Sequence, residues 1–346
     1  SAPFKTTIRL TVVAAFILVT LLTASIALGL QYYFSENMAK RAAAELYATT
    51  ASGVAAEING ISRVYANVIS LLADNTELAS PEREPELLQI FIGILEKNPM
   101  LYGAYIGRAD GSLFEVINLD NARRTRMNLG ESDSDRWLQV KVDRIEERGQ
   151  RSYRYLDADL NMRTTRFENT QYSALQRSWY QSALQSEDVQ VSRSYRFAQS
   201  GEPGRSISRR ISGTRSVAGL DMTLASLSGF LATQQIASDS GIYLFDKDGT
   251  VIASSQQAAT ASYQAPGITE PVADLSANSN GKISPELLAI AAKPAAEGQL
   301  IGTDIGKEPH LLFSARMSAD ANALYLGRVT PVSAVMAPFR EKILLS

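Results

Sequence analysis

Apolar residues dominate the N-terminal end of the chain. Residues 10–30 form a run of 21 positions without a charge. At a rise of about 1.5 Å per residue, a helix of this length crosses the hydrocarbon core of a bilayer. Lys5 and Arg9 precede the run, and two tyrosines follow it. Because basic residues remain on the cytoplasmic side and aromatic residues favour the interface, the pattern predicts a transmembrane helix over 10–30, with residues 1–9 in the cytoplasm.

A cleavable signal peptide is the alternative for this segment. Ser25 and Ala27 form a small-x-small pattern of the kind found at signal-peptide cleavage sites. The apolar run is longer than the core of a usual signal peptide, about 7–15 residues, which favours an uncleaved anchor. At the other end, residues 334–346 place an Arg-Glu-Lys cluster before an apolar run. We expect this segment to be the approach to a second transmembrane helix, truncated at the last residue.

Apolar residues recur with a heptad spacing after the anchor. The intervals alternate between four and three residues along Tyr47, Ala51, Val54, Ile58, Ile61, Tyr65, Val68 and Leu72. Since no proline interrupts them, residues 31–75 are predicted to form one long stalk helix. Such a seam packs either on a twin helix or on a sheet of its own chain. We expect both, at different heights along the stalk, and therefore a homodimer.

Alternating apolar and polar residues predict two α/β modules after the stalk. In the first module, residues 76–238, we expect a helix up to Lys97, strands at 101–108, 112–118, 137–142, 151–156, 189–197, 205–212 and 217–223, and helices at 178–185 and 224–237. In the second module, residues 239–333, we expect strands at 241–245, 250–255, 300–303, 310–317 and 324–329, a loop over 255–283 and a helix at 285–292. The predicted fold class is α+β: a transmembrane helix and a long stalk helix, followed by two stacked PAS-like modules with antiparallel sheets.

Composition narrows the range of functions. A hydrophobic content of 45% and a charged content of 20% are typical of a globular protein with an added apolar segment. The net charge of −2 gives no reason to expect nucleic-acid binding. The sequence has no cysteine and a single histidine, His310, which excludes disulfides, thiolate sites and multi-histidine metal sites. We therefore expect neither a metal nor a cofactor.

Motifs typical of catalysis are missing from the sequence. It contains no P-loop, no G-x-S-x-G elbow and no H-E-x-x-H motif. Asp246, Asp248 and Gly249 resemble the start of a calcium loop, but the distal glutamate of such a loop is absent. Asp133 and Asp135 lie in an acidic loop without a catalytic partner. We expect this portion not to be an enzyme, and the activity of a longer protein stays open.

One segment and one later strand combine the groups that a small zwitterion needs. Tyr172, Arg177, Trp179 and Tyr180 lie within nine residues, and Asp221 lies in a predicted apolar strand. An arginine binds a carboxylate through its bidentate fork. An aspartate binds an ammonium group, and aromatic rings supply walls and a cation-π face. The combination predicts recognition of a small molecule rather than its transformation.

The same residues resemble a family motif. The sequence Arg-x-Trp-Tyr-Gln-Ser-Ala-Leu is followed by Ser194-Tyr195 and by Gly-x-Asp-Met-Thr-Leu-Ala-Ser-Leu. This pattern resembles the double Cache (dCache) periplasmic sensor domains of bacterial transmembrane receptors, and their amino-acid-binding subgroup in particular. The resemblance covers roughly residues 35–335. It implies the two-module fold and a ligand site in the membrane-distal module.

The resemblance also implies a role for each residue of the motif. By position, Tyr172, Arg177 and Trp179 would contact the carboxylate of the ligand, and Tyr180 and Asp221 would contact its amino group. The Arg-x-Trp-Tyr pattern also occurs in Cache domains that bind other ligands. In those domains the tryptophan and the second tyrosine serve partly as packing.

Two further features leave the ligand class open. Tyr195 lies on a strand expected to face the motif helix, where it either closes the pocket or belongs to the core. The strands after the motif are also basic, through Arg193, Arg196, Arg205, Arg209, Arg210 and Arg215. Side chains alternate along a strand, so these arginines cannot all face one pocket. If some line the pocket, an organic acid or anion is the expected ligand; otherwise they are solvated or ion-paired.

These patterns together predict the sensor portion of a bacterial inner-membrane receptor, with its modules in the periplasm. The expected partners are a small-molecule ligand, the membrane and a second copy of the chain. Ligand binding would pass a conformational signal to a cytoplasmic output domain outside this sequence: a histidine kinase, a nucleotide cyclase or a chemotaxis domain. The alternative is a ligand-free structural or protein-interaction module.

Overall fold

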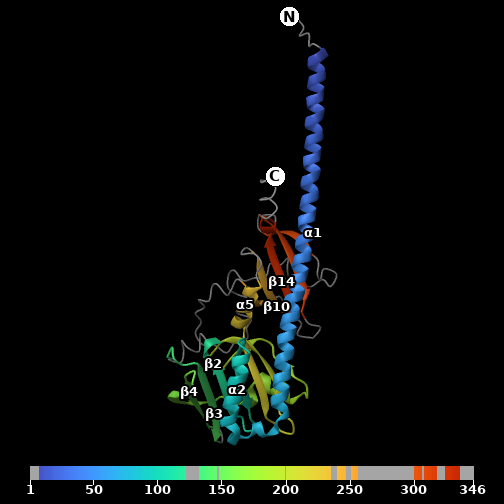
Figure 1. The fold of residues 1–346 in the computed structure, drawn as a ribbon. Coiled ribbons are helices and arrows are strands. Elements are labelled where there is room, and N and C mark those ends of the chain that lie inside the picture. Colours follow the sequence, from blue (N-terminus) through green and yellow to red (C-terminus); the bar gives the residue numbers. More distant parts are fainter. Residues whose placement is uncertain are drawn as a thin grey trace.

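One helix of 67 residues, α1 (Ile8–Asp74), runs along the whole molecule (Figure 1). The computed structural model describes residues 8–121, 132–145, 148–198, 200–234, 240–246, 251–255, 300–305, 308–317 and 324–335. The predicted transmembrane and stalk segments therefore form one uninterrupted helix. Within the described chain, Thr11–Ala42 is the one helical stretch long and apolar enough to cross a membrane, and its most apolar part is not buried.

A nine-stranded antiparallel sheet packs against the end of α1 farthest from the N-terminus. Its order is β5-β4-β3-β2-β1-β9-β8-β6, and the short β7 also pairs with β8. The strands are β1 (Leu101–Gly107), β2 (Leu113–Asn118), β3 (Trp137–Ile145), β4 (Arg148–Leu156), β5 (Met162–Thr170), β6 (Gln190–Val191), β7 (Tyr195–Arg196), β8 (Pro203–Arg210) and β9 (Val217–Thr223). The central β1 therefore lies between β2 and β9, which come from distant parts of the sequence.

Two strands of this sheet differ from the sequence prediction. The edge strand β5 was not predicted, because most of its side chains are exposed and its sequence lacks an apolar alternation. The strand expected over 189–197 divides into β6 and β7. Between them the hydroxyl of Ser192 accepts a hydrogen bond from the backbone N–H of Ser206 at 2.9 Å, while the N–H of Ser192 donates to the Ser206 carbonyl at 2.9 Å. A side-chain oxygen therefore takes the place of a backbone acceptor here.

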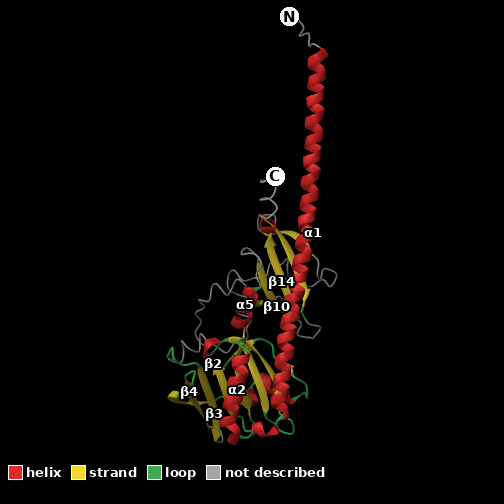
Figure 2. Ribbon diagram, in the orientation of Figure 1, coloured by secondary structure: helices red, strands yellow, loops and turns green. Residues whose placement is uncertain are grey.

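Helices α1 and α2 (Glu84–Lys97) cover one face of the nine-stranded sheet (Figure 2). The stalk contributes Tyr65, Ile69 and Leu72 to this core, and α2 contributes Leu87 and Phe91. Full burial of such a side chain is worth about 1.5–3 kcal/mol. The heptad seam from Val54 to Leu72 therefore packs on the sheets of its own chain. Val54, farther up the same seam, enters the core of the second sheet.

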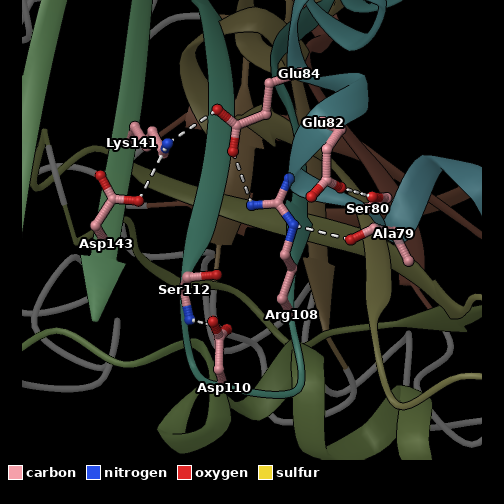
Figure 3. A network of polar contacts seen from close by, with 9 residues as sticks. All are labelled: Ala79, Ser80, Glu82, Glu84, Arg108, Asp110, Ser112, Lys141 and Asp143. Atoms are coloured by element: carbon pink, nitrogen blue, oxygen red, sulfur yellow. Dashed lines mark hydrogen bonds and ion pairs between the residues drawn. The ribbon is translucent and has the colours of Figure 1, made fainter. Parts of the chain in front are cut away.

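A charged network fixes the start of α2 to the sheet (Figure 3). Glu84 forms ion pairs with Arg108 and with Lys141, each at 3.1 Å. The Nε–H of Arg108 also donates to the carbonyl of Ala79 at 2.9 Å. Arg108 is buried and directly follows β1, so this network joins the β1–β2 turn to the segment between α1 and α2.

A five-stranded antiparallel sheet, in the order β11-β10-β14-β13-β12, packs farther up α1. Its strands are β10 (Gly241–Asp246), β11 (Val251–Ser254), β12 (Leu300–Ile305), β13 (Glu308–Arg316) and β14 (Leu324–Pro331). Helix α5 (Leu224–Thr233) leads into it from β9, and the hydroxyl of Thr223 caps this helix by accepting from the N–H of Ser226 at 3.1 Å. The predicted helix at 285–292 lies outside the described residues, as do the predicted loop over 255–283 beyond Ser255 and the predicted approach to a second span over 334–346 beyond Val335.

Candidate ligand-binding site

A pocket opens on the face of the nine-stranded sheet opposite α1 and α2. Side chains alternate along β1, so Ala104 and Ile106 enter the helix-covered core while Tyr105 faces the other side. The pocket is open to solvent on one side, and about 250 Å³ of empty space lies within it and in the solvent at its mouth. It is lined by Tyr105, Leu113, Glu115, Tyr172, Arg177, Trp179, Tyr195, Phe197, Ala198 and Asp221.

Asp221 is a buried carboxylate at the floor of the pocket. It lies on β9 and is only 5% exposed. The hydroxyl of Tyr105 donates to its Oδ1 at 2.8 Å, and the hydroxyl of Ser206 donates to the same oxygen. Burial raises the pKa of Asp221 to about 7, although these hydrogen bonds and the charge of Arg177 act in the opposite direction. No described residue forms an ion pair with this carboxylate.

Two glycines make room for the aromatic residues around Asp221. Gly219 lies opposite Tyr105 in the β1–β9 register, and a Cβ there would come within 2.2 Å of the Tyr105 ring. A Cβ on Gly107 would come within 2.6 Å of the Trp179 ring. The glycine of the Gly-x-Asp motif therefore allows the Tyr105 ring to cross β9 and to reach the carboxylate two residues farther on.

Arg177 extends its guanidinium between two tyrosines. The residue precedes α4 (Ser178–Leu184) in an extended conformation. Its guanidinium carbon lies 5.9 Å from the ring centre of Tyr172 and 5.7 Å from that of Tyr195, which are cation-π distances. Within the described chain its guanidinium has no hydrogen-bond acceptor and no acidic partner. Its donors therefore remain available in the pocket.

The two aromatic residues of α4 have different positions: Trp179 lines the pocket, and Tyr180 packs behind it. Trp179 lines the pocket and meets the Tyr105 ring edge-on, with 4.7 Å between ring centres. The hydroxyl of Ser208 donates to the Trp179 carbonyl at 3.0 Å, which fixes α4 on the sheet. Tyr180 turns away from the pocket. Its ring packs against Trp179, and its hydroxyl donates to the carbonyl of Arg215.

Tyr195 belongs to the pocket and to a chain of hydroxyls. It lies on the short β7, and its hydroxyl is 2.5 Å from the hydroxyl of Ser206. Since Ser206 donates to Asp221, Tyr195 donates to Ser206 in turn. Burial raises the pKa of Tyr195 well above its usual value, so the phenol stays protonated and remains a donor.

The structure brings five of the six predicted site residues to one pocket and leaves Tyr180 outside its lining. Sequence reasoning missed the contributions of Tyr105, Glu115 and Ser206. It also missed the remaining lining residues, Leu113, Phe197 and Ala198. Glu115 gave a usable signal, since it is a lone acidic residue in the apolar strand β2. Tyr105 and Ser206 gave none, because their proximity to Asp221 arises from strand register.

None of the six arginines after the motif lines the pocket. Arg209 forms an ion pair with Asp74 at 3.2 Å, and Arg205 donates to the carbonyl of Ser192 at 3.0 Å. Arg210 pairs with a glutamate, Arg196 donates to a backbone carbonyl, and Arg193 and Arg215 are exposed. These contacts correspond to the solvated or ion-paired alternative considered for the patch.

A comparison with curated proteins finds a relative of the chain. The chain is similar to adenylate cyclase 1 of Rhizobium meliloti (strain 1021), with 23% identity over 269 residues. The match covers 76% of this chain and 39% of the relative, so the chain spans about two fifths of the relative's length. No family model matches the chain.

Solved structures with a similar fold are sensor domains. The chain resembles the ligand-binding domain of the Campylobacter jejuni chemoreceptor Tlp3 in complex with L-valine, with a TM-score of 0.54 and 13% identity over 87% of this chain and 98% of that one. The sensory domain of Tlp3 with isoleucine bound gives a TM-score of 0.53 and 12% identity, with the same coverage. The predicted fold class is confirmed: the chain has the α+β double Cache fold.

Replacing Asp221 by asparagine tests the burial of its charge. The pKa of about 7 lies above the unfolded value of about 3.9. The stabilising effect of the proton is therefore complete below about pH 4 and is lost as the pH rises through 7. Asp221→Asn is uncharged at every pH and keeps an acceptor for Tyr105 and Ser206. At pH 8 we expect it to raise the free energy of unfolding of the ligand-free protein by on the order of a few kcal/mol.

The measurement is thermal unfolding of the wild type and the variant in detergent at pH 5 and pH 8. Asp188→Asn removes an exposed carboxylate and is the matched control, with little effect at either pH. A wild type as stable as Asp221→Asn at pH 8 would contradict the burial of a charge at this position.

Proposed function

We propose that the chain is the extracytoplasmic sensor portion of a bacterial transmembrane receptor and binds an α-amino acid in the pocket of the nine-stranded sheet. One observation carries this proposal. The guanidinium of Arg177 and the carboxylate of Asp221 line the same pocket, and neither forms an ion pair within the described chain. A buried charge without a partner is costly, as at Asp221. A zwitterion of amino-acid size supplies partners for this acid and for the half-buried Arg177 at once.

Each lining residue has a proposed role. Arg177 binds the ligand carboxylate, with the Tyr172 hydroxyl and the Trp179 indole as further donors. Asp221 binds the ammonium group, and Tyr105 and Ser206 hold its Oδ1, so that Oδ2 faces the ligand. Tyr195 closes the site, and Tyr180 supports Trp179 from behind. The two Tlp3 sensor domains carry L-valine and isoleucine and favour an amino acid over an organic acid.

The membrane and output parts of the proposal rest on other observations. The helix Thr11–Ala42 is long and apolar enough to span a membrane. This supports an anchor in the inner membrane, with the ligand module (76–238) and the smaller module (239–333) in the periplasm. The similarity to an adenylate cyclase favours a nucleotide cyclase as the output domain over a kinase or a chemotaxis domain. In this proposal the sensor portion itself has no catalytic role.

A direct route leads from the pocket to the end of α1. Ser206 and Asp221 lie on β8 and β9, whose connecting turn contacts the stalk. The N–H of Ser212 donates to the carbonyl of Ala73 at 2.8 Å, and Arg209 pairs with Asp74 at 3.2 Å. A ligand shifts a conformational equilibrium only through its different affinity for the two states. We propose that closure of β8 and β9 on the ligand displaces this end of α1.

A separate face of α1 is proposed to form the homodimer. The heptad seam from Val54 to Leu72 is covered by the chain's own sheets, but a second stripe with the same spacing faces outward. Leu46, Val64 and Leu71 on this stripe are 50%, 49% and 74% exposed. Gly53 and Gly60 lie between them, and a Cβ at either would meet nothing within 4 Å. Small and apolar residues at heptad spacing suit a close helix pair.

A thermal-shift screen of the chain against the twenty amino acids and a set of organic acids tests ligand binding. A ligand at about a hundred times its dissociation constant adds roughly 2.7 kcal/mol of stability. We expect a rise of several degrees with one or a few α-amino acids. Arg177→Ala and Asp221→Ala should each abolish it. Arg193→Ala, which removes an exposed arginine, should not.

Two outcomes would count against this function. A shift given by organic acids that survives the loss of Asp221 would contradict the assigned roles. If the protein is folded and no compound of the panel shifts its unfolding temperature, the ligand-free module would be favoured.

Disulfide cross-linking tests the proposed dimer. The chain contains no cysteine, so a single introduced cysteine reports on one position. Val64→Cys and Leu71→Cys are expected to form cross-linked dimers in membranes under mild oxidation, because both lie on the outward stripe. Ile69→Cys lies in the buried core and serves as the control that should not cross-link. Equal cross-linking at all three positions would contradict a specific helix pair.

A further inference from the structure

Three arginines and two tyrosines form an alternating series that leads from the edge of the nine-stranded sheet to the pocket. The guanidinium carbon of Arg166 lies 4.9 Å from the ring centre of Tyr153, and that of Arg151 lies 6.0 Å from the same ring centre. Arg151 also lies 5.5 Å from the ring centre of Tyr172, which Arg177 approaches to 5.9 Å. All four are cation-π distances. Tyr172 and Arg177 line the pocket, whereas Arg151 does not.

The outer part of this series fixes the position of Arg151. Arg151 on β4 lies opposite Glu168 on β5, and its Nη1 is 3.0 Å from the Oε1 of Glu168. The hydroxyl of Tyr153 donates to the same oxygen at 2.8 Å. The side chain of Arg151 is 11% exposed, so solvent screens this ion pair less than it screens a surface pair. Contacts within the sheet, rather than contacts in the pocket, therefore hold the Arg151 guanidinium.

Tyr172 has a fixed backbone and a hydroxyl that is free to serve the pocket. Its N–H donates to the hydroxyl of Thr170 at 3.1 Å, and its carbonyl accepts from the Nη1 of Arg144 at 2.9 Å. Its own hydroxyl forms no hydrogen bond within the described chain. Burial raises the pKa of this phenol above its usual value, so the hydroxyl stays protonated and can donate. The direction of that hydroxyl follows from the contacts of the ring, which include the two guanidinium groups.

The two arginines beside the Tyr172 ring differ in how their charges are compensated. Glu168 forms an ion pair with Arg151. Arg177 has no acidic partner within the described chain. Arg151 can therefore hold the ring without adding an uncompensated charge beside the pocket, and the charge of Arg177 remains available to a ligand.

We propose that Arg151 is a positioning residue for recognition of the ligand carboxylate. It holds the Tyr172 ring from outside the pocket, and the ring in turn supports the Arg177 guanidinium. This inference rests on the proposed function, because it assigns Tyr172 and Arg177 to the carboxylate of an α-amino acid. Side chains that are ordered only when the ligand binds cost affinity, and for two such side chains the loss is about tenfold.

The test measures dissociation constants by calorimetry on the 346-residue chain in detergent. The probes are the twenty α-amino acids, and those that bind the wild type are titrated into each variant. Arg151→Met keeps the length of the side chain and removes the guanidinium, so we expect about tenfold weaker binding. Arg151→Lys keeps an ion pair with Glu168 but lacks the planar group that stacks on a ring. It should weaken binding severalfold, and it replaces Arg151→Met if that variant does not fold.

The matched control is Arg154→Met, which removes an exposed arginine from the other face of the same strand and should leave the affinity unchanged. A double-mutant cycle separates positioning from a general loss of structure. In the Tyr172→Leu background, which has no ring to hold, Arg151→Met should cause no further loss of affinity.

Three results would count against the inference. Unchanged affinity in both Arg151 variants would overturn the role of Arg151 and leave the amino-acid sensor standing. An equal loss of affinity with and without the Tyr172 ring would overturn an action through Tyr172. Absence of binding by all twenty amino acids in the wild type would overturn the proposed function and this inference together.

Discussion

The site is organised around the carboxylate of Asp221, which is buried in the sheet and has no ion-pair partner among the described residues. Placing an ionised acid there costs free energy unless hydrogen bonds and an opposite charge compensate. Tyr105 and Ser206 supply the hydrogen bonds, and Gly219 supplies the space through which the Tyr105 ring reaches the acid. Arg177 acts on the Asp221 carboxylate through its charge and forms no hydrogen bond with it. Because no described residue forms an ion pair with Asp221, the cationic group of a ligand would complete this compensation.

The two faces of the nine-stranded sheet separate packing from recognition. Apolar residues such as Ala104 and Leu220 fix β1 and β9 against the helices. Their neighbours on the same strands project into the pocket. Strand β8 does the same, since Ser206 meets Asp221 on one side while Ile207 enters the helix-covered core on the other. A movement that the ligand imposes on β8 or β9 is therefore applied directly to the surface on which α1 packs.

Periodicity predicted much of this fold, and its failures have physical causes. The helices and the β1–β2 hairpin follow from local apolar spacing. Spacing alone does not identify what covers an apolar seam, so the stalk heptads indicated a twin helix as readily as the chain's own sheets. The motif predicted Arg177 and Asp221 because it joins them in a recognisable sequence. Glu115 and Ser206 reach the site through the order β2-β1-β9-β8, a relation of register that single-sequence patterns do not contain.

Proton release on ligand binding tests the central claim most directly. If Asp221 has a pKa of about 7 in the empty pocket and is ionised beside a bound ammonium group, binding near pH 6.5 must release a proton. Calorimetry in buffers of different ionisation enthalpy measures the number released. We predict roughly three quarters of a proton per ligand at pH 6.5, falling toward zero by pH 8.5 and absent in Asp221→Asn. Binding without proton exchange, or with proton uptake, would contradict the claim that Asp221 becomes ionised when it binds the ammonium group of the ligand.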